Sequence, residues 1–184
     1  MRHELMFSGI GGQGVMLLGE LLCSTAVKRG HIVTFAPSYG QEKRGGRTMC
    51  QVVISDEMGS PVISAAELLV VFDERSLVEY EHLVKENGII MINSSLIGIE
   101  PSRKDVRVIK VPVNDIAQEL GNPKTANMVA LGAVLNFVDF VDRAEVEAQV
   151  TNLFPPHKAN LIEINQKALE AGYKYVADLV SRAQ

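Results

Sequence analysis

Apolar and polar residues alternate along this chain in blocks that indicate strands and helices in turn. Continuous apolar runs at residues 68–72, 88–93 and 106–111 are typical of parallel strands covered on both faces, and shorter runs at residues 5–7 and 31–35 predict two more strands. From residue 13 to residue 29, apolar side chains recur every three or four positions, which predicts an amphipathic helix. The chain therefore opens in the order strand, helix, strand.

That order predicts a parallel β-α-β unit with a right-handed crossover, whose two strands lie side by side. Residues 48–54 alternate in polarity, and a turn at residues 56–59 followed by Pro61, Val62 and Ile63 predicts a β-hairpin inserted before the parallel strands resume. The fold class expected for residues 1–184 is α/β. We expect a single domain with a three-layer, Rossmann-like, mostly parallel sheet, an inserted β-hairpin and a helical C-terminal part.

Several residues mark where helices begin and end. Asp73 is expected to cap a helix that reaches Glu86, and a helix over residues 158–171 is expected to end at Gly172. Gly132 stands inside another apolar helix, where glycine costs about 1 kcal/mol relative to alanine. Close packing of two backbones is therefore expected at Gly132.

The composition excludes several classes of function. A net charge of −4 over 184 residues gives no electrostatic basis for binding nucleic acid or an anionic membrane. Cys23 and Cys50 stand apart and cannot supply a thiolate set for zinc or an iron–sulfur cluster, so two buried, reduced thiols are expected. No run approaches the length of a membrane span and the N-terminus does not resemble a signal peptide, which predicts a soluble, cytoplasmic protein.

The sequence contains no recognisable set of catalytic residues. None of the four histidines has metal-ligand spacing or stands near a nucleophile elbow, and no P-loop lysine follows the first glycines. Nucleotide hydrolysis is therefore disfavoured. We predict no catalytic residue and no metal site.

The first glycine-rich loop follows the first strand and precedes the first helix. Gly9, Gly11 and Gly14 match the G-x-G-x-x-G pattern, Gly12 adds a position that tolerates positive φ, and Gln13 completes the loop. Backbone N–H groups in such a loop converge on an anion at a helix N-terminus, although a tight turn without a ligand has the same sequence. An NAD site is disfavoured, because no acidic residue ends the second strand to hold a ribose.

A second polar loop follows the second strand, at the sheet edge where open α/β sheets bind ligands. Three cations surround one glutamate there, which suits phosphate or carboxylate; a solvated surface loop is the alternative. The candidate ligand- or partner-binding residues of the two loops are Gly9, Gly11, Gly12, Gln13, Gly14, Ser38, Tyr39, Gly40, Glu42, Arg44, Gly45, Gly46 and Arg47.

Together the two loops resemble the gamma subunit, or gamma domain, of 2-oxoacid:ferredoxin oxidoreductases. The similarity rests on residues 9–15 and 37–46, and it extends to residues 52–55, Asn127 and residues 131–133, so that it covers nearly the whole chain. The resemblance implies alpha and beta partner subunits, and often a small ferredoxin-like delta subunit. It also implies an accessory role in converting a 2-oxoacid and coenzyme A to acyl-CoA and CO₂, with electrons passing to ferredoxin.

In this family thiamine diphosphate, Mg²⁺ and the iron–sulfur clusters belong to other subunits or domains, and coenzyme A is a substrate. The resemblance favours 2-oxoglutarate as the oxoacid, and the equivalent subunit of an indolepyruvate oxidoreductase is an alternative. The loops, with Arg44 and Arg47, could hold the phosphates of coenzyme A or an acidic loop of a sister subunit. The rival interpretation is a pure assembly module with no small-molecule site. The isolated chain is expected to self-associate as a homodimer through a face that includes residues 38–46.

Overall fold

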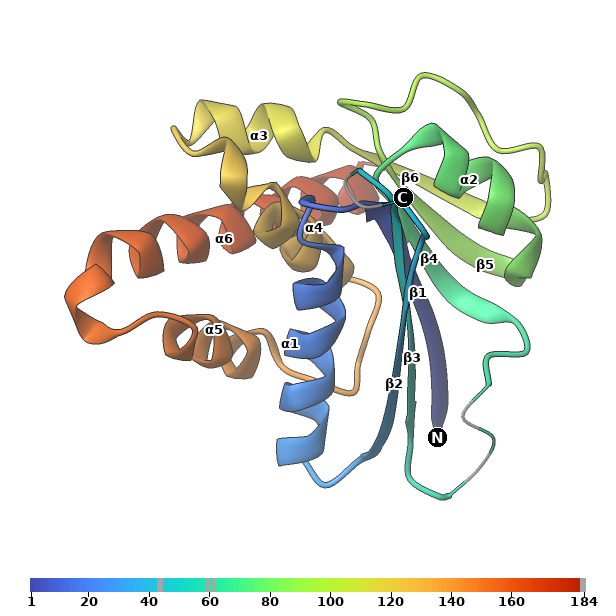
Figure 1. The fold of residues 1–184 in the computed structure, drawn as a ribbon, viewed down its shortest axis with the longest axis horizontal. Coiled ribbons are helices and arrows are strands. Elements are labelled where there is room, and N and C mark those ends of the chain that lie inside the picture. Colours follow the sequence, from blue (N-terminus) through green and yellow to red (C-terminus); the bar gives the residue numbers. More distant parts are fainter. Residues whose placement is uncertain (43–44, 59, 61, 183–184) are drawn as a thin grey trace.

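The computed structural model describes residues 1–42, 45–58, 60 and 62–182. In this part of the chain six strands form one sheet with helices on both faces (Figure 1). The strands are β1 (Arg2–Ile10), β2 (Ile32–Tyr39), β3 (Arg47–Ser55), β4 (Ala66–Val71), β5 (Val84–Asn93) and β6 (Arg107–Val111). The α-helices are α1 (Val15–Lys28), α2 (Glu74–Tyr80), α3 (Val113–Glu119), α4 (Ala126–Val134), α5 (Arg143–Asn152) and α6 (Ala159–Ser181). Three short 3-10 helices are η1 (Glu81–Leu83), η2 (Pro123–Thr125) and η3 (Pro156–Lys158).

The strand order is β2-β3-β1-β4-β5-β6. Strands β1, β4, β5 and β6 are parallel, whereas β3 is antiparallel to both of its neighbours, β1 and β2. The predicted α/β domain with a mostly parallel sheet and a helical C-terminal part is confirmed. The expectation that β1 and β2 lie side by side is wrong, because β3 lies between them and pairs with both.

The β-hairpin is not where the sequence pattern placed it. β3 pairs with β2 from Thr48 to Ser55, so these two strands form the hairpin, and the chain reverses between Tyr39 and Arg47. Val62 and Ile63, expected in a returning strand, are not in a strand, and Pro61 lies outside the described residues. Alternating polarity identifies a strand, but it does not show whether the partner strand precedes or follows it.

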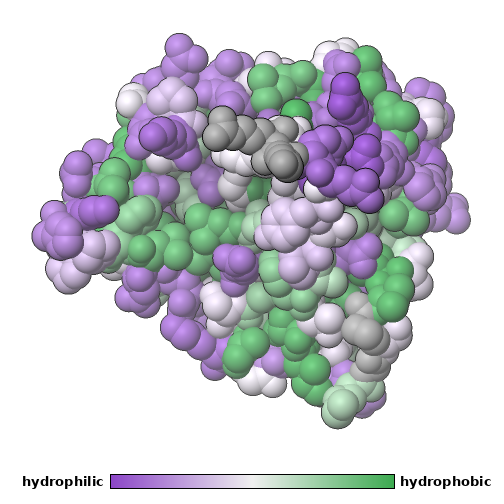
Figure 2. Space-filling model, viewed as in Figure 1, coloured by the Kyte–Doolittle hydropathy of each residue, from purple (hydrophilic) through white to green (hydrophobic). Residues whose placement is uncertain are grey.

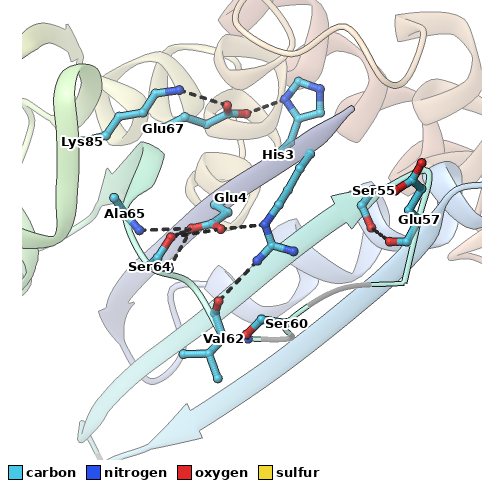
Figure 3. A network of polar contacts seen from close by, with 11 residues as sticks. His3, Glu4, Ser55, Glu57, Ser60, Val62, Ser64, Ala65, Glu67 and Lys85 are labelled. Carbon is cyan, nitrogen blue, oxygen red and sulfur yellow. Dashed lines mark hydrogen bonds and ion pairs between the residues drawn. The ribbon is translucent and has the colours of Figure 1, made fainter.

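A buried carboxylate holds the segment that leads from β3 to β4 (Figure 3). Glu4 of β1 accepts hydrogen bonds from the backbone N–H groups of Ser64 at 2.8 Å and Ala65 at 3.1 Å, and from Arg2 Nε at 2.8 Å. Burial by itself raises the pKa of Glu4. The N–H group of Ala65 and the guanidinium of Arg2 outweigh that effect and hold the pKa below the ordinary glutamate value.

Two apolar cores lie on the two faces of the sheet, which gives the molecule three layers (Figure 1). Helices α1, α4 and α6 cover one core, and the shorter α2 covers the other. Neighbouring residues of β1 point to opposite faces, so Phe7 lies in the first core and Met6 in the second. On the face shown in Figure 2, apolar side chains form a band across the middle and also reach the upper, right-hand and lower margins, whereas polar side chains dominate the left-hand margin.

The sequence predicts the start of α2 correctly but places its end too late. As predicted, Asp73 caps this helix by accepting hydrogen bonds from N–H groups of its first turn. The helix ends at Tyr80 rather than at Glu86, because β5 already begins at Val84, where it pairs with β4. No helix within the described ranges is both long enough and apolar enough to cross a membrane.

Two glycines form the crossing of α4 and α6. A Cβ atom built on Gly132 would lie 1.9 Å from the carbonyl oxygen of Leu169, and one built on Gly172 would lie 1.8 Å from that of Val129. The close packing expected at Gly132 is confirmed. The expectation that Gly172 ends its helix is wrong, because α6 continues to Ser181 and uses this glycine to approach α4.

Candidate functional site

The two glycine-rich loops are neighbours at one edge of the sheet, as the sequence predicts. The Gly11 N–H donates a hydrogen bond to the Gly46 carbonyl oxygen at 2.9 Å, and Ile10 at the end of β1 pairs with Arg47 at the start of β3. The loops meet because the first loop follows β1, the second loop precedes β3, and these two strands pair with each other. β1 and β2 themselves are not adjacent. Main-chain atoms therefore fix their relative position.

The glycines of the first loop have different roles. Gly12 has φ of +99° and faces open space, so it permits a backbone conformation that other residues rarely adopt. Gly9 leaves room for the Gln13 side chain, whose Oε1 accepts a hydrogen bond from the Ile10 N–H at 2.7 Å and closes the turn. Gly14, with φ of +76°, lies against Asn127 at the start of α4 and is the N-cap of α1.

The backbone donors of this loop are partly used within the protein. Gly11 donates to Gly46, and the Gln13 N–H donates to the Ile10 carbonyl at 3.1 Å. The Gly11 N–H, one of the donors that the glycine pattern offers to an anion, is therefore not available to a ligand. Within the described part of the chain, the donors left for a ligand are those of Gly12, Gly14 and the first turn of α1, which has no acidic side chain and no side-chain cap.

The second loop is shaped by Glu42. The Gly40 N–H donates to the Arg47 carbonyl at 2.6 Å and closes the hairpin. A Cβ atom on Gly40 or Gly46 would lie 2.5 Å or 2.9 Å from Glu42 Oε2, so these glycines make room for a carboxylate folded back over the loop. Gly45 has φ of +66°, which again favours glycine.

Arg47 is already engaged with α2. Its guanidinium forms an ion pair with Glu79 and a hydrogen bond with Tyr80, and that hydrogen bond, followed by the charge of Glu79, raises the pKa of Arg47. Burial raises the pKa of Tyr80. Arg44, the other expected cation, lies outside the described residues. Among the described residues that line the cleft, Arg47 is the cation, and it is paired with Glu79.

A cleft of about 750 Å³ lies between the loops and α1. Val15, Met16 and Leu17 give it an apolar wall, and its charged side chains among the described residues are Glu20, Glu42 and Arg47. The remaining lining residues are Ile10, Gly11, Gly12, Gly14, Tyr39, Gly40, Gly45, Gly46 and Thr48. The structure thus gathers most of the predicted residues around one hollow.

Ser38 faces a second hollow of about 440 Å³ on the other side of the hairpin loop, which Tyr39, Glu42 and Arg47 also line. Sequence reasoning missed Glu79 and Tyr80, which line this second hollow. No local signal identifies them, since their partner Arg47 is distant in the sequence. Only the packing of α2 beside β3 brings these groups together.

The cysteines lie apart from the cleft surface. Cys23 and Cys50 are both buried, and burial raises the pKa of each thiol to about 12. Across the described ranges, no three His, Cys, Asp or Glu side chains lie close enough to hold a metal ion. The donor set of the described residues does not fit an iron–sulfur cluster.

Comparison with known proteins identifies similar chains. The family model described as pyruvate ferredoxin/flavodoxin oxidoreductase matches residues 4–175. Ketoisovalerate oxidoreductase subunit VorA of Methanothermobacter marburgensis is 35% identical over 92% of this chain, which spans only 35% of that protein. 2-Oxoglutarate synthase subunit KorC of Methanocaldococcus jannaschii is 31% identical over 97% of this chain and 96% of its own length.

A solved structure shares the whole fold. The gamma subunit of a keto/oxoacid ferredoxin oxidoreductase from Geobacter sulfurreducens PCA superposes with a TM-score of 0.82 at 27% identity, covering 96% of this chain and 99% of that one. The chain thus corresponds in length to the separate small subunits, and to about a third of the longer VorA protein.

Proposed function

The chain belongs to the pyruvate ferredoxin/flavodoxin oxidoreductase family, and from this premise we propose that it is the gamma-type accessory subunit of a 2-oxoacid:ferredoxin oxidoreductase. Its partners are alpha and beta subunits, with a delta subunit in some complexes. The complex converts a 2-oxoacid and coenzyme A to acyl-CoA and CO₂ and passes the electrons to ferredoxin. The observation that carries the proposal is the match to a named small subunit along nearly the full length of both chains.

In this proposal the redox cofactors reside in the partners. Thiamine diphosphate and Mg²⁺ are assigned to the partners by the family resemblance. The iron–sulfur clusters need a thiolate set that Cys23 and Cys50, the two cysteines of this chain, do not supply. The chain contributes surfaces that bind and orient. We place the complex in the cytoplasm, where reduced, buried thiols such as Cys23 and Cys50 persist.

We propose 2-oxoglutarate as the oxoacid, because the relative from Methanocaldococcus jannaschii, 31% identical and matched over 96% of its own length, is named a 2-oxoglutarate synthase subunit. The test is to purify the native complex through this chain and to identify the co-purifying subunits. Turnover is then compared for 2-oxoglutarate, pyruvate, ketoisovalerate and indolepyruvate with ferredoxin as acceptor. Preference for indolepyruvate would assign the chain to the alternative enzyme, and the absence of oxidoreductase partners would refute the accessory role.

We further propose that the cleft between the loops holds the diphosphate of coenzyme A. The N–H groups of Gly12, Gly14 and the first turn of α1 are hydrogen-bond donors for an anion in the cleft. The helix dipole adds about 0.3–1 kcal/mol to the binding free energy of that anion. A volume of about 750 Å³ suits a small-molecule ligand, and the apolar wall around Met16 suits its uncharged part. Arg47 can exchange its exposed pairing with Glu79 for a phosphate, since such pairs contribute little.

Gly12→Val tests the cleft, with Gly30→Val as the matched control. Both glycines have positive φ, +99° and +88°, and both face open space. Each substitution should therefore cause the same backbone strain, about 1–2 kcal/mol. Only Gly12 lines the cleft, whereas Gly30 lies at the opposite end of α1. In the assembled enzyme, Gly12→Val should raise KM for coenzyme A several-fold while Gly30→Val leaves it unchanged.

The rival function, a pure assembly surface, is favoured by Tyr39, which is 68% exposed at the mouth of the cleft. If the loops serve only assembly, Tyr39→Ala and Gly12→Val should weaken co-purification of the other subunits. The complex that still forms should then keep the wild-type KM for coenzyme A. That combination would refute the coenzyme A site while leaving the accessory role intact.

A further inference from the structure

His3 links β1 to a segment that is distant from it in the sequence. The residue lies near the start of β1, at the edge of the sheet opposite the cleft, and its ring is directed at Glu67 of β4 (Figure 3). The Nδ1 atom of the ring lies 2.6 Å from Glu67 Oε1. The Nε2 atom lies 3.2 Å from Oδ1 of Asp139, in the segment that joins α4 to α5 (residues 135–142). One imidazole ring therefore lies between two carboxylates.

The short contact with Glu67 determines which nitrogen of the neutral ring carries the proton. A carboxylate only accepts hydrogen bonds, so Nδ1 is the donor and the protonated nitrogen. Nε2 of the neutral ring then has a lone pair and no proton. On the same side of the ring, Lys85 Nζ lies 3.5 Å from the second oxygen of Glu67 and helps to hold that carboxylate in place.

The contact with Asp139 depends on a second proton. Nε2 is buried and makes no hydrogen bond with the described residues, so its contact with Asp139 at 3.2 Å is electrostatic. In the neutral ring the lone pair of Nε2 faces a carboxylate oxygen, and the two repel each other. In the imidazolium the positive charge attracts the same oxygen. A single proton on His3 therefore reverses the sign of this contact.

Asp139 is free to move, whereas its neighbour in the sequence is not. The Asp139 side chain is 82% exposed, but Phe140 is 2% exposed and its ring centroid lies 5.0 Å from that of His3. On β3 the residue opposite His3 is the uncharged Ile54. A hollow of about 440 Å³ borders the ring and is lined on one side by residues 136–139. Asp139 can therefore turn away from His3 and leave the core in place.

We propose that His3 is a proton-controlled latch, which holds Asp139 and residues 136–139 against β1 when the ring is charged and releases them when the ring is neutral. The charged and titratable groups that face the ring are Glu67 from β4, Lys85 from β5 and Asp139 from the 135–142 segment. Histidine ordinarily changes charge between about pH 5 and pH 8, whereas carboxyl and amino side chains ordinarily titrate outside that range. The latch therefore closes on the acidic side of the range and opens on the alkaline side. This inference does not rest on the proposed function, since it concerns the opposite edge of the sheet from the cleft.

A double-mutant cycle on the full chain tests the latch. His3→Gln keeps a side chain that can donate to Glu67 but carries no charge, and Asp139→Asn removes the carboxylate at an exposed position. Urea unfolding of the wild type, the two single variants and the double variant gives the coupling between the two residues at about pH 5.5 and pH 8. At the lower pH the pair should raise the folding equilibrium constant about 1.4- to 5-fold, the range for a partly exposed ion pair. At the higher pH this coupling should vanish or reverse.

His31→Gln combined with Asp139→Asn is the matched control. His31 pairs with a different carboxylate, Asp56 at 3.1 Å, so its coupling to Asp139 should stay near zero at both pH values. NMR reports the release directly, because the resonances of residues 136–139 should follow the titration of the His3 ring in the wild type and not in Asp139→Asn. This comparison remains valid even where His3→Gln does not fold. Equal coupling at the two pH values, coupling that grows at the higher pH, or wild-type resonances of residues 136–139 that do not follow the His3 titration would overturn the proposal.

Discussion

Replacing Gly132 with alanine should drive α4 and α6 apart, because their backbones touch at this residue. The added Cβ would lie 1.9 Å from the Leu169 carbonyl oxygen and 2.9 Å from the Tyr173 nitrogen. Ordinary contact begins at 3.4 Å, so the shortfall at the oxygen is about 1.5 Å, and neither atom belongs to a side chain that can rotate away.

The expected cost follows from two opposing effects. Overpacking a close contact costs typically 1–3 kcal/mol, and a backbone clash belongs at the upper end of that range. Alanine is favoured over glycine within a helix by about 1 kcal/mol, which offsets part of this cost. The net loss should be about 2 kcal/mol, or roughly 4–8 °C in Tm for a chain of this size.

Gly172→Ala places a second methyl group at the same crossing, 1.8 Å from the Val129 carbonyl oxygen. Once the helices have separated for one methyl group, the other should cost less. The double variant should therefore lose less than the sum of the single losses, by about 1 kcal/mol. Urea unfolding followed by circular dichroism measures all four proteins. Full additivity, or a loss below about 0.5 kcal/mol for Gly132→Ala, would refute the reasoning.

The remaining predictions concern ionisable groups. Because burial raises the pKa of Cys23 and Cys50 to about 12, both thiols should resist a thiol reagent at mildly alkaline pH in the native chain and react when urea unfolds it; rapid native labelling would contradict this. The pKa of Glu4 is lower in the folded state than in the unfolded state, so Glu4 stabilises the fold above its unfolded pKa and loses that effect as the pH falls through its folded pKa. Wild type should exceed Glu4→Gln in stability at neutral pH, and the difference should shrink in acid; a pH-independent difference would contradict the assignment.

Much of the fold could be predicted because the signals are local. The apolar runs of β4, β5 and β6 reflect cover on both faces, and Asp73 caps the helix that directly follows it. Gly132 was identifiable because glycine inside an apolar helix is costly without a compensating contact. In each case the residue and its cause lie within one element.

The errors concern contacts between distant segments. Gly172 has the local signature of a helix end, yet the approach of α4 explains it. β3 has the pattern of an outer hairpin strand, yet it lies between β1 and β2. Arg47 was correctly placed at the cleft, but its pairing with Glu79 depends on how α2 packs. A sequence pattern carries no information on such pairings unless both partners are known.

The strand order also bears on how the chain can fold during synthesis. Of the six strands, β1 is synthesised first, and it lies inside the sheet, flanked by β3 on one side and β4 on the other. The β2–β3 hairpin can dock on one edge of β1, and β4, β5 and β6 can then add in turn to its other edge. From β3 onward, each strand finds a partner that is already made, so few unpaired edges wait for a late segment. Because α6 follows all six strands in the sequence, its contact with α4 can close the larger core over a sheet that is already complete.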